Sequence, residues 1–445
     1  MDKKWQEMNS DERRAERFKK WLSPPGVTFN SRKAETSYKQ KVQRLIDTIE
    51  LKTLPDRVPV IVPLGISPAY NAGVDLRTVM YDYRALTRAF KKTIRDFDLD
   101  ILDIFYFGWP AKVYELLDYK VYNWPGHGLP LDASSYQFIE DEYVKADEYD
   151  ALLHDAVDYG QRVFLPRLFG AMEPFRENPR LTPYNGLPMG LLASFIRPDI
   201  RELYKKLIRA GEELSKLNKI TSSCRVFALK SGFPILRSGF ATAPFDRLGD
   251  SLRGTKGIAV DMYRRPEKIL EFMDMVTPEI IASAVAAVNR SECPIVSIPL
   301  HKGQDNYMSQ SQFEKFYWPP LKKVIEGLAA EGIVALVGAE GKFGSRLDYV
   351  KEVPKGTTIW WFEETDMEEA QKALHGTACI AGNVPGSLLA FGTPQEVKDY
   401  CRRTIEGAGR DGGLILHGTQ SMQPIDPANF QAMLDAAREY GHYTR

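Results

Sequence analysis

Short apolar runs alternate with amphipathic segments from Val58 onward, and this rhythm constrains the fold more than any other feature of the chain. Strands are predicted over residues 58–62, 101–107, 226–229, 295–300, 333–337, 358–362, 378–381 and 414–417. Alternation of strand and helix predicts a parallel sheet, whose strands are buried on both faces and read as continuous apolar runs. About eight such runs favour a closed α/β fold, a single (β/α)8 TIM barrel, over an open doubly wound sheet.

The segments outside this rhythm predict an arm and an insertion. Residues 1–57 are expected to form a helical N-terminal arm, in which a Pro-Pro-Gly stop at 24–26 separates two helices. Residues 58–445 then form the barrel domain. Residues 108–225 fit the alternation poorly and predict an insertion over the barrel mouth, with a helix over 140–150. Capping boxes are predicted at Thr365 with Glu368 and at Thr393 with Glu396.

Charge and cysteine content exclude several classes of partner. Lys plus Arg and Asp plus Glu each number 59, so the net charge is zero and favours neither nucleic acid nor an anionic membrane. No stretch approaches the roughly 18 apolar residues that cross a bilayer, and the charged first 20 residues lack the apolar region of an export signal. The widely spaced cysteines predict no disulfide, so we expect a reduced, cytoplasmic protein. They are Cys224, Cys293, Cys379 and Cys401.

Three motifs resemble the uroporphyrinogen decarboxylase superfamily. Residues 238–245, followed by Pro266-Glu267, resemble its glycine–proline–phenylalanine strand end. The Gly-Asn-Val-Pro turn at 382–385, with Gly-Thr-Pro-Gln-Glu-Val at 392–397, is similar to its strand-seven signature. Residues 414–418, with Pro424 and Asn429, resemble its strand-eight histidine motif. The resemblance, which extends back to residues 56–60, implies the same barrel fold.

The resemblance implies two kinds of activity, because a shared fold does not fix the reaction. The superfamily contains cofactor-free tetrapyrrole decarboxylases and corrinoid-dependent methyltransferases, which often use zinc. The decarboxylases carry arginines just after the first strand, which suit a substrate with many carboxylates. The matching residues 63–73 contain no basic side chain here. This departure disfavours a polycarboxylate substrate.

The zinc-binding methyltransferases carry a His-x-Cys motif and a later cysteine as ligands. The corresponding positions here are Gly338-Ala339-Glu340 and His417, so the thiolates are replaced by a carboxylate and an imidazole. Both remain competent zinc ligands, and Glu363, at the end of the intervening strand, offers a third. Glu340, Glu363 and His417 are therefore predicted to hold zinc with one open position.

This ligand chemistry predicts methyl transfer from a small methylated substrate, aryl methyl ethers included, to a separate corrinoid protein. Such O-demethylation requires a Lewis acid or a proton donor at the ether oxygen. Cobalamin on the partner would accept the methyl group. The alternatives are a decarboxylase of a porphyrin-like or other carboxylate substrate, and a non-catalytic binding protein. The resemblance also implies a homodimer.

The candidate site residues lie at predicted strand ends or in loops beside them. The candidate catalytic residues are His417, His301, Glu340 and Asn383. The candidate substrate-binding residues are Trp109, His127, Tyr106 and Trp361. Simpler roles compete with these: the histidines can pack in the core or stiffen turns, the glutamates can be solvated loop acids, and Asn383 can organise its own turn. Aromatic side chains belong to the core more often than to a pocket.

Overall fold

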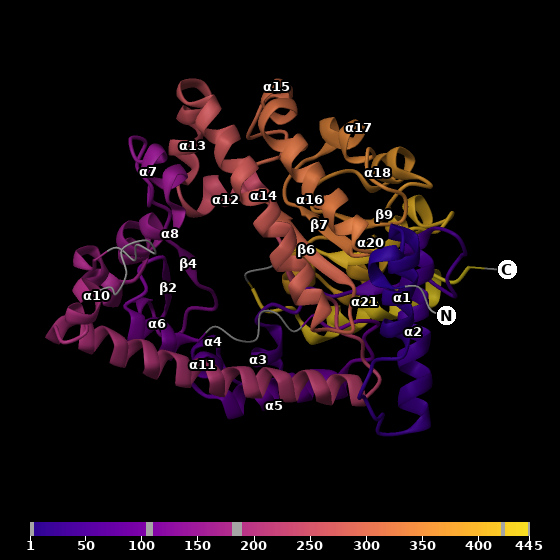
Figure 1. Cartoon of the computed structure of the whole chain (residues 1–445). Helices are drawn as coiled ribbons and strands as arrows, with labels where there is room; N and C mark the ends of the chain where they lie inside the picture. Colours follow the sequence, from indigo (N-terminus) through magenta and orange to yellow (C-terminus); the bar gives the residue numbers. More distant parts are fainter. Residues whose placement is uncertain (1–3, 104–109, 180–188, 420–422, 444–445) are drawn as a thin grey trace.

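The computed structural model describes residues 4–103, 110–179, 189–419 and 423–443 (Figure 1). Its main sheet is parallel and has seven strands in the order β1-β10-β9-β8-β7-β6-β5. Those strands are β1 (Val60–Ile61), β5 (Gly239–Phe240), β6 (Ile295–Leu300), β7 (Val334–Ala339), β8 (Thr358–Phe362), β9 (Cys379–Val384) and β10 (Leu414–Gly418). The sheet curls around a common interior, as the predicted α/β barrel requires.

Residues 100–102 occupy the eighth position, between β5 and β1. Leu102 forms a parallel bridge to Ile235, and its backbone N–H donates to the Pro234 carbonyl at 2.9 Å. On the other side, the Val60 N–H donates to Oδ2 of Asp100, also at 2.9 Å. A side chain thus takes the place of a strand ladder on that side. The predicted barrel is confirmed, although residues 104–107 of the predicted second strand lie outside the described residues.

Helices cover the outside of the sheet from β5 onward. They are α12 (Pro244–Ser251), α13 (Gly254–Arg264), α14 (Pro266–Asn289), α15 (Gln310–Gln312), α16 (Trp318–Ala330), α17 (Leu347–Val350), α18 (Met367–Leu374), α19 (Gly386–Phe391), α20 (Pro394–Ala408) and α21 (Pro427–Tyr440). Thr393 and Glu396 form the predicted capping box of α20. The box predicted at Thr365 is wrong, because Asp366 caps α18 and the Thr365 hydroxyl instead accepts the Phe343 N–H.

The helical N-terminal arm packs on the barrel. It consists of η1 (Trp5–Glu7), α1 (Ser10–Leu22) and α2 (Arg32–Glu50). Arg44 of α2 and Arg57 both bind the carboxylate of Asp100, which is 1 % exposed. The Tyr38 hydroxyl donates to the Trp21 carbonyl at 2.9 Å and joins the two arm helices. The arm therefore belongs to the same apolar core as the strands.

The first part of the insertion lies on the side of the molecule away from α1 and α2, and the long helix α11 (Pro198–Lys230) then runs back toward α2 (Figure 1). A small sheet in the order β3-β2-β4 lies within it. The elements between β1 and β5 are α3 (Ser67–Asn71), α4 (Leu76–Tyr81), α5 (Tyr83–Asp96), α6 (Ala111–Leu117), β2 (Tyr122–Pro125), β3 (Gly128–Leu129), β4 (Gln137–Phe138), α7 (Tyr149–His154), α8 (Ala156–Tyr159), η2 (Gly160–Phe164), α9 (Leu165–Leu168), η3 (Gly170–Glu177), α10 (Met189–Ser194) and α11 (Pro198–Lys230).

Two sequence predictions for this region are wrong. Residues 226–229 belong to the long helix α11, where Cys224 and Ala228 are buried four residues apart while Val226 is exposed, a helical rather than a strand pattern. Residues 140–148 are not helical, because their polar groups bind α13 and the turn before it. The Glu140 carboxylate accepts the Thr255 N–H at 2.6 Å, and the Val144 N–H donates to Leu252.

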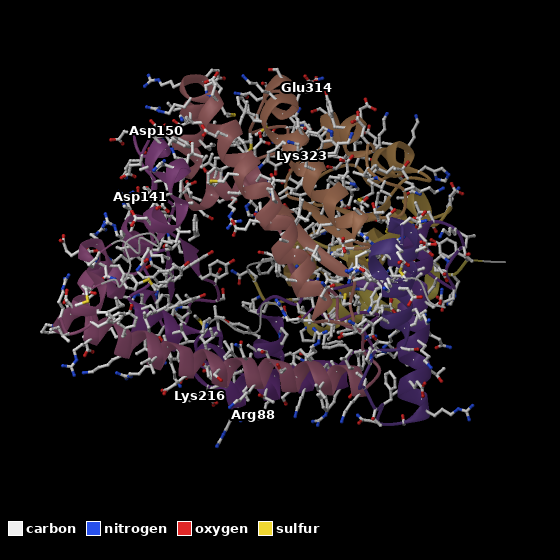
Figure 2. The ribbon with its side chains drawn as sticks, viewed as in Figure 1. Arg88, Asp141, Asp150, Lys216, Glu314 and Lys323 are labelled. Atoms are coloured by element: carbon white, nitrogen blue, oxygen red, sulfur yellow. The ribbon has the colours of Figure 1, made fainter. Side chains whose placement is uncertain are left out.

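Charged side chains project from the outer helices. Arg88 on α5 and Lys216 on α11 both point away from the ribbon in Figure 2. Within the described ranges, no helix combines the length and the apolar character needed to cross a bilayer.

Candidate active site

Three of the predicted site residues stand at the carboxyl ends of neighbouring strands. His301 follows β6, Glu340 follows β7 and Glu363 follows β8. The register pairs Leu300 with Ala339 and Ala339 with Phe362, so the residues that come next lie side by side on one rim of the barrel. In (β/α)8 barrels, this rim carries the active site.

His301 is held by groups on both of its ring nitrogens. Its Nδ1–H donates to Oδ2 of Asp250 at 2.5 Å, and its Nε2 lies 3.6 Å from Oε1 of Glu340. Burial alone would lower the pKa of His301, but the hydrogen bond to Asp250 and the Glu340 charge outweigh burial and raise the pKa to about 9. His301 is therefore a cation at neutral pH.

Glu340 faces His301, and its pKa is raised as well, but for a different reason. Removal from water raises the pKa of the Glu340 carboxyl to about 7, and the nearby Glu363 carboxylate adds to the rise although His301 opposes it. Its side chain remains 40 % exposed, so a substrate in the barrel mouth can reach it. A carboxyl group with a pKa near neutrality can give or take a proton at physiological pH.

Two aspartates of α12 bind His301 and the residue after it. Asp246 is buried and accepts the backbone N–H groups of His301 at 2.9 Å and Lys302 at 3.1 Å, together with the Tyr317 hydroxyl at 2.6 Å. Asp250 binds the side chains of His301 and Lys302. Neither aspartate is among the predicted site residues, although their spacing of four residues places both on one helical face next to the motif at 238–245.

Asp246, Asp250 and His301 are also the described residues best placed for a metal ion. Each offers one ligand atom, and these atoms lie within 4.8 Å of one another. The same atoms already receive protein donors, however, and the Lys302 ammonium shares Asp250 with the imidazole. A cation at this point would displace those donors and meet a like charge. The arrangement thus suits a hydrogen-bonded anchor better than a metal centre.

The predicted zinc ligands are not gathered into one such group. Glu340 and Glu363 are neighbours, and Oε2 of Glu363 accepts the Gly341 N–H at 3.1 Å. Across the described residues, the only group of three whose ligand atoms all lie within 4.8 Å is the Asp246, Asp250 and His301 group, so His417 does not complete the predicted set at that distance. The zinc site stays a prediction.

His417 and Trp361 form a stacked pair. Their ring centroids lie 4.2 Å apart, and the Nδ1–H of His417 donates to the Gly418 carbonyl at 2.5 Å. Burial lowers the pKa of His417 to about 3, and the Arg237 charge acts in the same direction. The His417 ring is therefore neutral, with Nε2 as an acceptor. His417, predicted from the strand-eight motif, thus meets Trp361, predicted as an aromatic side chain at a strand end, on strands β10 and β8.

The other predicted residues have different surroundings. The Asn383 amide donates to the Thr365 carbonyl at 3.1 Å, and its oxygen accepts the Tyr400 hydroxyl at 2.9 Å, which is what a loop-organising residue does. His127 stacks on Trp124 in the insertion, with ring centroids 4.0 Å apart. Tyr106 and Trp109 lie outside the described residues.

The insertion reaches the barrel mouth through two residues of its β3–β4 connection. Burial raises the pKa of Tyr136, and the Glu340 charge contributes to the same rise, so this ring lies near the rim. The Ser134 hydroxyl donates to Oε1 of Gln423, in the segment after β10, at 3.4 Å. These contacts agree with an insertion over the mouth, as the sequence predicts.

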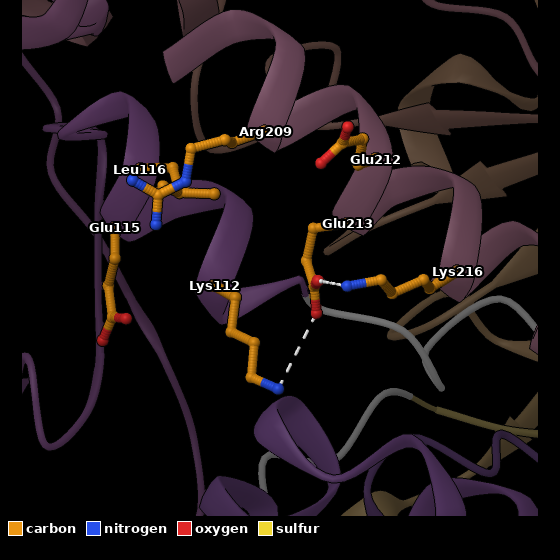
Figure 3. A pocket seen from close by; sticks show the side chains of 7 residues that line it. All are labelled: Lys112, Glu115, Leu116, Arg209, Glu212, Glu213 and Lys216. Carbon is orange, nitrogen blue, oxygen red and sulfur yellow. Dashed lines mark hydrogen bonds and ion pairs between the residues drawn. The ribbon is translucent and has the colours of Figure 1, made fainter. Parts of the chain in front are cut away.

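A separate surface groove of about 430 Å³ lies between α6 and α11 (Figure 3). Its charges largely balance one another, since Lys112 and Lys216 both approach Glu213, at 3.7 and 2.8 Å. It is lined by Lys112, Glu115, Leu116, Arg209, Glu212, Glu213 and Lys216. None of these residues comes from the strand ends, so we place the active site on the rim.

Comparisons with known proteins agree with this architecture. Residues 193–440 match the model of the uroporphyrinogen decarboxylase (URO-D) family. The fold is similar to that of a methyltransferase from Methanosarcina mazei, with a TM-score of 0.59 and 15 % sequence identity over 90 % of this chain and 98 % of that one. No curated protein matches the sequence. The structural likeness at this identity concerns the fold alone.

Proposed function

The chain belongs to the uroporphyrinogen decarboxylase family, and from that premise we propose that it transfers a methyl group from a small methylated substrate to a corrinoid carried by a separate protein. The observation that carries the proposal is the pairing of His301 with Glu340 on the barrel rim, with 3.6 Å between Nε2 and Oε1. This pair is a source of protons for a leaving group. The similarity of the fold to that of a methyltransferase also supports methyl transfer as the proposed reaction.

The charges around the rim argue against a substrate with many carboxylates. Asp250, Glu340 and Glu363 place acidic groups there. The nearby cations are already paired with aspartates, because His301 and Lys302 bind Asp250 and Arg237 binds Asp103. Polycarboxylates are bound by free guanidinium groups, which the stretch after β1 also lacks. A neutral methylated substrate such as an aryl methyl ether avoids this repulsion.

Demethylation of an ether requires a proton at the oxygen that is left behind. When the bond between the methyl carbon and the oxygen breaks, the oxygen keeps the electron pair, and protonation by the Glu340 carboxyl turns it into a hydroxyl. The Nε2–H of His301 can then return a proton to Glu340. The half-buried Trp361 ring, which stacks on the buried and neutral His417, offers a flat face for an aromatic substrate. The corrinoid supplies the nucleophilic cobalt that accepts the methyl group.

Zinc bound by Glu340, Glu363 and His417 remains a separate proposal. It would supply a Lewis acid at the same oxygen in place of the Glu340 proton, because a carboxylate that binds a metal carries no proton. Metal analysis of the purified protein, with Glu340→Gln as the comparison, tests it. A metal-free protein with full activity would refute it.

A methyl-transfer assay tests the proposed reaction. The protein is incubated with aryl methyl ethers and free cob(I)alamin, and methylcobalamin formation is followed by absorbance. Glu340→Gln should slow transfer by about 100-fold, because the proton donor is lost while the shape is kept. Glu364→Gln, at an exposed carboxylate beside Glu363, is the matched control and should retain the rate. Release of CO2 from uroporphyrinogen without any corrinoid would replace the proposal by the decarboxylase alternative.

A further inference from the structure

Helix α12 presents two carboxylates to the same two residues, but to different parts of them. Asp246 binds backbone, at the N–H groups of His301 and Lys302. Asp250 binds side chains, at Nδ1 of His301 and Nζ of Lys302. The first contact fixes where the loop after β6 runs, and the second fixes how the His301 ring is turned.

We propose that Asp250 is a positioning residue of the active site, which holds the Nδ1–H of His301 and thereby aims Nε2 at Glu340. The inference rests on the proposed function, because that function gives His301 its task. The two nitrogens of an imidazole are chemically distinct, and the partner of one determines what the other can do. Without Asp250, the ring loses the acceptor that holds its Nδ1–H and can rotate, so the Nε2–H is no longer held facing Glu340.

The packing around Asp250 leaves the pair little freedom. The Lys302 side chain runs across Gly249, where an added Cβ would lie 2.8 Å from Cδ of Lys302. Lys302 is 7 % exposed, and its ammonium binds the second oxygen of Asp250. With both oxygens engaged, the Asp250 carboxylate cannot swing away from the imidazole. The arrangement is that of an oriented acid–imidazole pair rather than a surface ion pair.

The competing explanation is that both aspartates only hold the loop in place. Asp246 provides the control, because Asp246→Asn disturbs the backbone anchor and Asp250→Asn disturbs the ring anchor with the same chemical change. We expect Asp246→Asn to lower the melting temperature more than Asp250→Asn does. Asp250→Asn should instead lower kcat by about 10- to 100-fold, a loss like that from removing the group that orients a metal-bound histidine, with KM nearly unchanged. Asp250→Glu should restore part of the rate.

Nitrogen NMR of protein labelled with 15N-histidine provides a readout that needs no turnover. In the unaltered protein at neutral pH, the His301 signals should show a proton held on each ring nitrogen, and in Asp250→Asn they should show exchange between ring states. This measurement does not require methyl transfer to be observed. It therefore separates a failure of the positioning role of Asp250 from a failure of the proposed function. An unchanged His301 spectrum in Asp250→Asn, or equal losses of stability and equal kcat in the two Asn variants, would overturn the proposal.

Discussion

Two parts of the barrel are held together by different forces. From β6 to β10, neighbouring strands share continuous ladders, and β6 pairs with β7 at six successive positions; we call this part the laddered half. Around β1, residues 100–102 and β5, the strands are two residues long or reduced to a single bridge. There the charged side chains of Arg44, Arg57 and Asp100 make the connections, and we call this part, with the attached insertion, the charge-held half.

The difference between the two halves bears on which strand ends can hold catalytic side chains. His301, Glu340 and Glu363 all follow strands of the laddered half, whose backbone hydrogen bonds fix the strand ends relative to one another. Groups that exchange protons must be held to within a fraction of an ångström, which ladders achieve better than flexible side chains. The charge-held half instead contributes Tyr136 and the rest of the insertion, which cover the mouth.

The largest effect is expected from breaking the connection at Asp100. Asp100→Ala removes the acceptor of the Val60 N–H and leaves the buried Arg57 without its carboxylate. Loss of one partner from a buried pair costs about 3–5 kcal/mol, and urea unfolding should show a loss of that size. Asp348→Ala removes an exposed pair with Lys351 and should change stability by less than about 0.5 kcal/mol. Equal losses in the two variants would mean that the connection at Asp100 does not close the barrel.

A smaller loss of stability is expected when the pH is lowered, through an ion pair in the insertion. Arg167 binds both oxygens of Glu148, each at 2.7 Å, and this hydrogen-bonded pair lowers the pKa of Glu148 from 4.5 to about 2. A lowered folded-state pKa stabilises the fold above the unfolded value, so the contribution is complete above about pH 5 and is lost as the pH falls toward 2. Allowing for partial exposure, we expect the loss to be about 1–2 kcal/mol.

Thermal unfolding between pH 7 and pH 3 checks this expectation, with Glu148→Gln as the reference. The variant should be less stable at pH 7 and lose less on acidification than the unaltered protein. Parallel pH curves for the two proteins would show that the Glu148–Arg167 pair contributes nothing, and would weaken the view that charges hold this half.

The sequence predicts the laddered half well and the charge-held half poorly. Strands β6 and β8 have the bounds predicted for them, because strands buried on both faces are uninterrupted apolar runs. Strand β5, with two residues, offers no such run, and the apolar end of α11 was mistaken for a strand. Length and periodicity cannot separate a short strand from a buried helical turn.

The residues of the candidate site likewise differ in how well the sequence predicts them. His301, Glu340 and Glu363 could be predicted because each follows an apolar run. For Asp246 and Asp250 the sequence indicates only a shared helical face, and they acquire their role when β6 brings His301 beside that helix. The contact between Trp361 and His417 likewise depends on how three strands curl, which no local pattern contains.

The smallest expected effect comes from a helix cap in the laddered half. Thr393 accepts the Glu396 N–H at the start of α20, and the Glu396 carboxylate accepts the Thr393 N–H at 2.8 Å. Thr393→Ala should lower stability by about 1 kcal/mol, the usual cost of a lost cap, and leave methyl transfer unchanged because the ladders keep the rim in place. Asn9→Ala removes the equivalent cap of α1 on the arm and should cost a similar amount. If Thr393→Ala slowed turnover at the rim while Asn9→Ala did not, the strand ends would depend on the outer helices, and the ladders alone would not explain the position of the site.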